Sequence, residues 1–346
     1  SLGAAIAIIT ASFFLYTLVR DYRNRIARIT SALLFLVMIT YISGLGVSYA
    51  EGLAPALPWL RFQWIGIAFV PVVHLHLSDA LLEMTGLPSR GRRRISVRVV
   101  YGIAALLLGL AWFTGWIVRD PIPYPAPHYQ PGPGFAIFVA YFVVAFTTSY
   151  WFIIRAYRRT LTSFTRRRML YLLVIGAAPA LAVFPFLLVS GRALESPLVF
   201  YPTLVIVDSV LAVMFSMLAY VLAFFGTVLP DRVIKAKMLQ FFLRGPVVAI
   251  ATLGVIVWAP GAGRILQLPG DEIMPFLAIA MILFLHWALT LMQPHLERWL
   301  IHGDQPEIRH LQRLERRLLT GEDFQEILET ILTSLCDYLR VESAFV

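Results

Sequence analysis

The stretch WLRFQWIGIAFVPVVHLHLSDALL, residues Trp59–Leu82, decides the fold that we expect for this chain. It is long and mostly apolar, and as a helix rising 1.5 Å per residue it would cross a hydrocarbon core about 30 Å thick. Backbone groups in lipid must be satisfied within the segment, so a run of this kind is helical. Polar side chains interrupt it at a few positions, which is uncommon at membrane depth. We therefore expect a membrane-spanning helix that carries polar contacts.

Apolar runs of similar length recur along the whole chain. Hydrophobic residues are 59% of its 346 residues, charged residues are 14%, and the mean hydropathy is +0.76, which excludes an ordinary soluble domain. The alternation of barrel strands is not seen. We predict an all-α polytopic bundle of nine spans. The eighth span could start earlier than its range below, inside Leu239–Val248, and kink at Gly245–Pro246. The nine predicted spans are Leu2–Val19, Ile29–Tyr49, Leu60–Leu82, Val99–Val118, Gly134–Ile154, Met169–Ser190, Pro197–Val228, Gly245–Pro260 and Ile273–Met292.

The distribution of basic residues predicts the orientation of these spans. The even-numbered links hold only Arg192 and Arg264, besides Arg61 and Arg119 at span ends, whereas the odd-numbered links are rich in arginine. The positive-inside rule then places the N-terminus outside and the C-terminal tail in the cytoplasm. We interpret the net charge of +9 as topology and contact with anionic headgroups, not as nucleic-acid binding. The basic residues of the odd links are Arg20, Arg23, Arg25, Arg28, Arg90, Arg92, Arg93, Arg94, Arg98, Arg155, Arg158, Arg159, Arg166, Arg167, Arg168, Arg232, Lys235, Lys237 and Arg244.

One outside link differs from the others in its proline content. RDPIPYPAPHYQPGPG, Arg119–Gly134, is the longest of them. Proline removes backbone donors and favours extended or turn conformations. We interpret the link as a rigid cap between helices, and a loop that holds a ligand is the alternative.

Four ionisable residues of the third span are candidate sensing residues: Arg61, His74, His76 and Asp79. The two histidines lie two residues apart, about 200° around a helix, so they cannot bind one metal ion from one face. His76 and Asp79 are three residues apart, so the carboxylate could orient a ring nitrogen. Because both are close to the cytoplasmic end, an interfacial polar cluster is the plainer interpretation.

Two further candidates lie in later spans. Asp208, in LVIVDSVLAV of the seventh span, is a lone mid-depth carboxylate that must be protonated or paired. A hydrogen bond to Ser209 or to a tyrosine of another helix would satisfy it, and a proton relay or ligand contact is the alternative. His286 in the ninth span could bind haem only with a second axial histidine. We therefore predict no cofactor and no metal.

The residues after Met292 are compatible with water. In 293–319 an apolar stripe at three- and four-residue intervals predicts a helix that leaves the membrane. Two copies could pair through this stripe as a short parallel coiled coil, and packing on the same chain is the alternative. The stripe residues are Ile308, Leu311, Leu314 and Leu318.

The segment after Thr320 resembles the start of a GAF domain. A helix leads into the strand VESAFV, and the pattern at its end is matched by Leu339, Val341, Ala344 and Val346. The part before it resembles the multi-span N-terminal sensor region of bacterial histidine kinases. The matching features are RRRMLYLLVIGAAPAL, which opens the sixth span, and a motif in the third span formed by Trp59, Arg61, Gln63, Trp64, Gly66, Ile67 and Pro71.

The resemblance implies a membrane sensor domain at 1–292, a signalling helix at 293–319 and the first helix and strand of an α/β GAF domain at 320–346, which would continue beyond Val346. We expect a multi-pass protein of the bacterial inner membrane that passes a stimulus to a cytoplasmic GAF and kinase output. Its partners would be the lipid bilayer and a second copy. The chain shows no Walker loop, HExxH or GxSxG, so the residues predict no catalysis of their own.

Two other functions stay open. A structural membrane subunit of an energy-transducing or photosynthetic complex would use the tail to contact partner membrane subunits. A transporter or haem-quinone protein would need a polar path or an axial histidine pair, and the spans contain few polar groups.

Overall fold

Helices account for nearly all of the regular structure in the computed structural model, which describes residues 2–20, 24–87, 89, 91–160, 163–190, 196–223, 240–266, 270–301, 332–334 and 336. One small antiparallel sheet is formed by β1 (Val118–Ile122) and β2 (His128–Pro131). The helices are α1 (Leu2–Arg20), α2 (Arg25–Tyr49), α3 (Leu53–Met84), α4 (Arg92–Phe113), α5 (Phe135–Arg159), α6 (Ser163–Ile175), α7 (Ala178–Val183), α8 (Phe186–Ser190), α9 (Pro197–Ala223), the π-helical turn η2 (Leu243–Val247), α11 (Val248–Leu266) and α12 (Gly270–Ile301).

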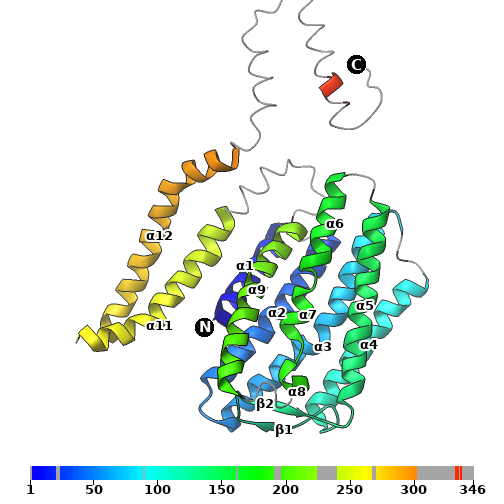
Figure 1. Ribbon diagram of the computed structural model, residues 1–346, viewed down its shortest axis with the longest axis horizontal. Helices are drawn as coiled ribbons and strands as arrows, with labels where there is room; N and C mark the ends of the chain where they lie inside the picture. The colour runs from blue at the N-terminus through cyan, green and yellow to red at the C-terminus, as the bar shows by residue number, and fades with distance from the viewer. Residues whose placement is uncertain are drawn as a thin grey trace, which may run out of the picture.

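Helix α3 is the inner helix of the bundle. Within an apolar stretch of 18 residues, 83% of the residues of α3 are buried. The corresponding share is 44% or less in every other long helix. It contacts α2, α4, α5 and α7 on its sides and β1 at one end. Figure 1 shows α3 between α2 and α7 on one side and α4 and α5 on the other. A helix surrounded by protein can carry polar groups that lipid would not tolerate, which is why the polar stretch identified in the sequence occupies this position.

Glycines let α2 and α3 approach each other closely. A Cβ added to Gly66 would lie 1.9 Å from the Thr40 hydroxyl oxygen and 2.6 Å from the Leu36 carbonyl oxygen. A Cβ on Gly46 would lie 2.1 Å from the ring of Trp59. Small residues at helix contacts are the usual means of association in membranes, where lipid is as apolar as the interface. Trp64 of α3 is buried against Phe138 of α5, with ring centroids 5.1 Å apart.

The sixth predicted span is broken into α6, α7 and α8. Helix α6 ends at Ile175, and Gly176 and Ala177 form a turn before α7 begins with Pro179 in its first turn. A second break precedes α8, where the Phe186 amide donates to the Phe184 carbonyl across Pro185. Proline cannot donate to the helical ladder, and a proline lies at each of the two interruptions.

The proline-rich link forms a β-hairpin, which the sequence analysis did not predict. Strands β1 and β2 pair with a register shift between Arg119 and Pro121. The glycines of its PGPG end are required by close approach, because a Cβ on Gly132 or Gly134 would lie within 2.4 Å of Trp116. The hairpin also corrects the end predicted for the fourth span, since α4 ends at Phe113 and Val118 begins β1. Contacts of β1 with α3 and of β2 with α8 favour the interpretation as a cap.

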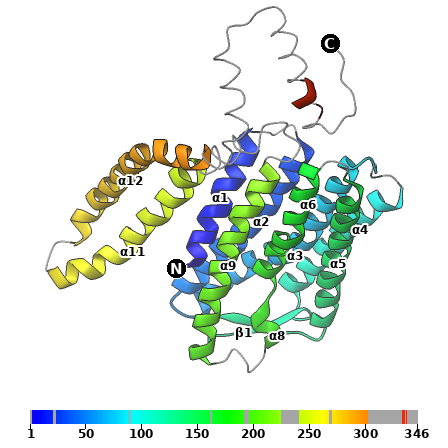
Figure 2. The same cartoon turned by 45° about the horizontal axis from the view of Figure 1, so that its top comes forward.

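Helices α11 and α12 form an antiparallel pair that stands beside the bundle in both views (Figures 1 and 2). Phe241 anchors this pair by contacting Phe13 and Tyr16 of α1, with ring centroids 5.4 and 4.5 Å apart. The helix begins at Gln240, inside the earlier start that the sequence allowed, and the π turn η2 contains Gly245 and Pro246. A π turn is the kind of irregularity that proline induces in a helix.

Within the part of the chain that the structure describes, seven helices are long and apolar enough to cross a membrane: Leu2–Val19, Arg25–Tyr49, Leu53–Met84, Arg92–Phe113, Phe135–Arg159, Pro197–Leu218 and Gln240–Val257. Two further predicted spans coincide with the shorter apolar helices Met169–Val183 and Phe276–Met292. The predicted apolar stripe at 308–318 lies outside the described residues. So does nearly all of the predicted GAF segment, where residues 332–334 and 336 are helical.

Candidate sensing site

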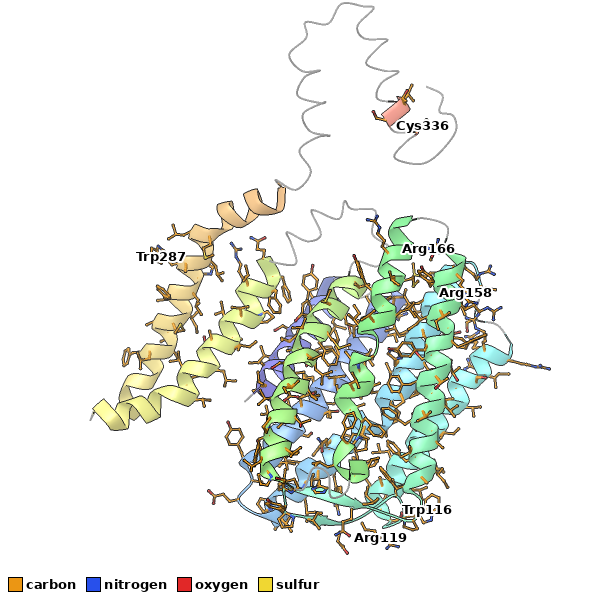
Figure 3. The ribbon with its side chains drawn as sticks, viewed as in Figure 1. Trp116, Arg119, Arg158, Arg166, Trp287 and Cys336 are labelled. Carbon is orange, nitrogen blue, oxygen red and sulfur yellow. The ribbon has the colours of Figure 1, made fainter. Side chains whose placement is uncertain are left out.

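One end of the bundle carries many arginines, and the other carries the β-hairpin. Figure 3 shows Arg158 and Arg166 at the first, which we call the arginine end, and Trp116 and Arg119 at the second, the hairpin end. The polar side chains of α3 are distributed between these ends, so they do not form one pocket. Three separate polar contacts result, and each ties α3 or α9 to a neighbouring helix.

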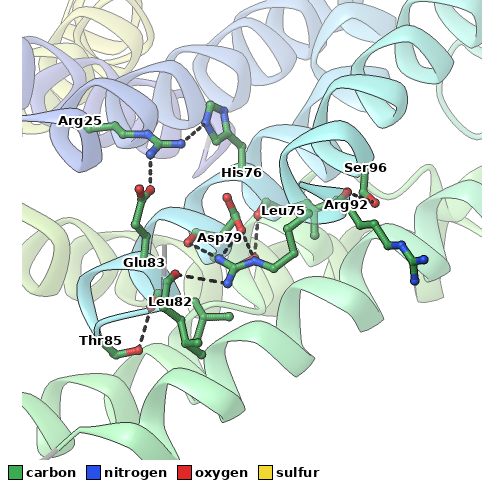
Figure 4. A network of polar contacts seen from close by, with 12 residues as sticks. Arg25, Leu75, His76, Asp79, Leu82, Glu83, Thr85, Arg92 and Ser96 are labelled. Carbon is green, nitrogen blue, oxygen red and sulfur yellow. Dashed lines mark hydrogen bonds and ion pairs between the residues drawn. The ribbon is translucent and has the colours of Figure 1, made fainter. Parts of the chain in front are cut away.

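At the arginine end, Asp79 of α3 binds Arg93 of α4 (Figure 4). Two guanidinium nitrogens, Nε and Nη2, donate to one carboxylate oxygen at 2.9 and 2.6 Å. Arg93 also donates to the Leu87 carbonyl and lies over the ring of Phe152, 5.5 Å from its centroid. The Asp79 side chain is 1% exposed and that of Arg93 is 20% exposed. This is a buried ion pair, and the loss of either partner would leave an uncompensated charge.

His76 lies in the same cluster, but its ring nitrogens contact residues other than Asp79. Its Nε2 atom is 3.4 Å from an Arg25 guanidinium nitrogen and its Nδ1 atom is 3.2 Å from the Tyr101 hydroxyl. A guanidinium only donates, so Nε2 accepts and the ring hydrogen is on Nδ1. Arg25 also pairs with Glu83. The predicted contact of Asp79 with a His76 ring nitrogen is therefore wrong, because Arg93 offers the carboxylate a full opposite charge.

His74 belongs to a second contact, at mid-depth. Its Nδ1 atom is 2.6 Å from the Ser149 hydroxyl of α5, which also donates to the His74 carbonyl at 3.2 Å. On the other side, a Cβ built on Gly176 would lie 3.7 Å from His74 Nε2. Buried His74 therefore touches both α5 and the break between α6 and α7. The two histidines face different helices, in agreement with their spacing in the sequence.

Removal of the Ser149 hydroxyl should destabilise this contact. We expect Ser149→Ala to lower the free energy of unfolding by about 1–3 kcal/mol, since the buried His74 nitrogen loses its partner. Thr148→Ala is the matched control, because the hydroxyl of Thr148 makes an exposed hydrogen bond to the Val144 carbonyl of its own helix. Its effect should stay within about 0.5 kcal/mol. Equal losses in an SDS titration of the two variants would contradict the assignment.

Asp208 of α9 makes the third contact. The Tyr41 hydroxyl of α2 donates to its Oδ1 atom at 3.4 Å, while Ser209 donates to the Val205 carbonyl of its own helix. Of the two hydrogen bonds predicted for Asp208, the one to a tyrosine is confirmed. Its second oxygen lies 3.9 Å from a Cβ built on Gly3 of α1. Asp208 thus sits where α1, α2 and α9 meet.

The remaining candidates lie apart from these contacts. Arg61 is at the hairpin end, where its carbonyl accepts from the indole of Trp112. Burial raises the pKa of the Tyr129 hydroxyl in β2, and the hydrogen bond with the Arg61 guanidinium lowers it in part. His286 is exposed on α12. Among the described residues, no group of three or more His, Cys, Asp or Glu side chains could hold a metal ion.

Sequence reasoning missed the partners Arg93, Arg25, Tyr101 and Ser149, and it predicted a tyrosine partner for Asp208 without identifying Tyr41. Two of them were counted among the topology arginines, and nothing in the spacing distinguished them from their exposed neighbours. The burial of α3 could have been inferred, because its polar residues point in several directions and each needs protein beside it.

The arrangement defines a polytopic helical membrane protein with a central polar helix and no catalytic constellation among the described residues. Residues 2–226 match the family described as the N-terminal 7TM region of histidine kinase, and the chain belongs to this family. It is therefore a membrane sensor region for signalling, as the resemblance implied. No curated protein and no solved structure gives a match to the chain.

The extent of the match clarifies the spans. Residues 2–226 contain six of the seven long apolar helices, and the segment Met169–Val183 is the further apolar helix within the match. The broken segment α6–α8 is not among the long helices, because each of its pieces is too short to cross a membrane. Helices α11 and α12 lie beyond the matched region. The eighth and ninth predicted spans fall on these two helices.

Proposed function

We propose that this chain is the membrane input module of a signalling protein and that α12 carries the signal to a cytoplasmic output. The observation that supports this most directly is the length of α12. It runs without interruption from Gly270 to Ile301, about 48 Å at 1.5 Å per residue. This exceeds a hydrocarbon core of about 30 Å. Helix α12 would thus cross the hydrocarbon core and continue into the water beyond it.

The proposed orientation places the arginine end in the cytoplasm of a bacterial inner membrane and the N-terminus outside. Arg25, Arg93, Arg158 and Arg166 all lie near that end, in accordance with the positive-inside rule. The output would begin with the GAF-like segment at 320–346. Two copies would pair through the stripe at 308–318.

The proposed route of the signal passes through α1. Helix α12 contacts α11 and η2, and these contact α1, which in turn contacts α2 and α9. We propose that a stimulus alters the polar contacts of Asp208 or the α3 residues and so shifts α1 against α2. Arg61, His74, His76 and Asp79 are the candidate residues on α3. The further candidate His286 is exposed on α12, the helix that would carry the signal to the output. A stimulus acts only to the extent that it favours one arrangement over the other.

Alanine insertions after Met292 test the role of α12. Each inserted residue rotates the following helix by about 100°. In the natural full-length protein in membranes, we expect phosphotransfer from ATP to rise and fall as one to four alanines are added, with recovery near four. The control is the same insertion series in the tip of the β-hairpin, between Pro125 and Ala126. A monotonic loss with α12 insertions, or an equal oscillation with hairpin insertions, would contradict a rotating or sliding α12.

A further inference from the structure

An apolar groove lies where the additional helices join the bundle. Its volume is about 440 Å³. The lining residues come from α1, η2, α11 and α12, so the groove is at the joint between the family's bundle and the pair that leads to the exit. They are Ile8, Gly245, Val248, Ala249, Thr252, Leu253, Ile256 and Ile282.

The local sequence keeps this groove open. A Cβ built on Gly245 would meet nothing within 4 Å. Phe241 holds the start of the helix against α1, and the π turn that follows displaces the chain beyond it. Irregular π turns are frequent at functional sites. The groove lies along the next turns of α11, beyond this anchor and the π turn.

The lining indicates what can occupy the groove. The hydroxyl of Thr252 already donates to the Val248 carbonyl at 2.8 Å, and the other lining side chains carry no polar atom. Water needs two to four polar partners, and the lining side chains offer only the oxygen of Thr252. The lining residues belong to membrane-spanning helices, so the surrounding medium consists of acyl chains. An acyl chain can fill such a groove by van der Waals contact alone.

A positive charge beside the groove indicates which membrane leaflet would supply the lipid. Arg244, an exposed residue, directly precedes Gly245 at the groove's arginine end. A guanidinium has five donors, so it can bind a phosphate in addition to other partners. From Gly245 to Ile256 the helix rises about 16 Å, a length suited to much of one acyl chain.

We propose that this groove is a binding site for one acyl chain of an anionic phospholipid from the arginine-end leaflet, with its phosphate on Arg244. The bound acyl chain lies between α1 and the α11–α12 pair, so its presence alters the packing of this pair against the bundle. That consequence rests on the proposed function, whereas the binding site itself does not.

Lipid retention tests the site. The protein is released from nanodiscs of equal phosphatidylglycerol and phosphatidylcholine, and bound lipid is counted by native mass spectrometry. We expect Gly245→Leu and Ala249→Leu, which fill the groove, to lower phosphatidylglycerol retention about fivefold, the equivalent of about 1 kcal/mol. Gly254→Leu is the matched control, because Gly254 is on α11 like Ala249, has open space at its Cβ like Gly245 and does not line the groove. Arg244→Gln should remove the preference for phosphatidylglycerol over phosphatidylcholine.

Each outcome decides the proposal. Unchanged retention in both groove variants, or an equal loss in Gly254→Leu, would mean that only boundary lipid is present and would overturn it. Two groove variants are used so that misfolding of one, seen as lost helicity, leaves the other to decide. If retention falls as expected while phosphotransfer by the full-length protein is unaffected, the lipid site stands and the proposed coupling fails.

Discussion

Arg93→Met should be among the most destabilising single substitutions in this chain, with an expected loss of about 3–5 kcal/mol in the free energy of unfolding. The change retains an apolar side chain but leaves the Asp79 carboxylate, 1% exposed, without its opposite charge. It also removes the hydrogen bond to the Leu87 carbonyl, which joins α4 to the turn before it. Unfolding by SDS titration in mixed micelles measures the effect.

The neighbouring ion pair supplies a control. Arg25 and Glu83 have side chains that are 45% and 36% exposed, so Glu83→Gln should cost about 1 kcal/mol or less. The double variant Asp79→Leu with Arg93→Met should recover most of the stability, because removal of both buried charges can be nearly neutral. A double variant as unstable as Arg93→Met alone would show that packing, not the unpaired carboxylate, causes the loss.

Gly66→Ala is the second substitution expected to have a large effect. The added Cβ would lie 1.9 Å from the Thr40 hydroxyl oxygen and 2.6 Å from the Leu36 carbonyl oxygen, so α2 and α3 must separate. Overpacking of this kind costs about 1–3 kcal/mol and sometimes more. A separation of these helices also displaces the most buried helix of the bundle. The same SDS titration measures the change.

Gly102→Ala is its matched control, since Gly102 lies in α4 and its Cβ would meet nothing within 4 Å. There alanine should stabilise the helix by about 0.5–1 kcal/mol. Thr40→Ala combined with Gly66→Ala should restore only part of the loss, because the Leu36 carbonyl still obstructs the Cβ. Equal stability of the Gly66 and Gly102 variants would contradict the close helix contact.

Much of the fold could be predicted from local sequence. The apolar runs gave the helices because lipid leaves the backbone no other partner. The breaks in the sixth span and at Gly245–Pro246 followed from glycine and proline, whose effects act within one turn. The β-hairpin was missed, because a proline-rich link gives no alternating pattern, and its strands depend on Trp116 meeting Gly132 and Gly134.

The candidate site could be predicted only in part. Asp79, His74, His76 and Asp208 stood out because ionisable groups in apolar runs are rare, and the structure places all four on contacts between helices. The choice among partners did not follow from the sequence. Asp79 had His76 three residues away on its own helix, yet it binds Arg93 of α4.

The sequence by itself determined that this chain is a bundle of membrane helices with arginine-rich links on one side, since hydropathy and charge act on each segment independently. Only the tertiary structure decided which helices surround α3, that Asp208 meets Tyr41 and that α1 joins the bundle to α11 and α12. These features depend on which helix faces are adjacent. In a membrane that choice depends on close packing and hydrogen bonds between segments far apart in the chain, and no local pattern records it.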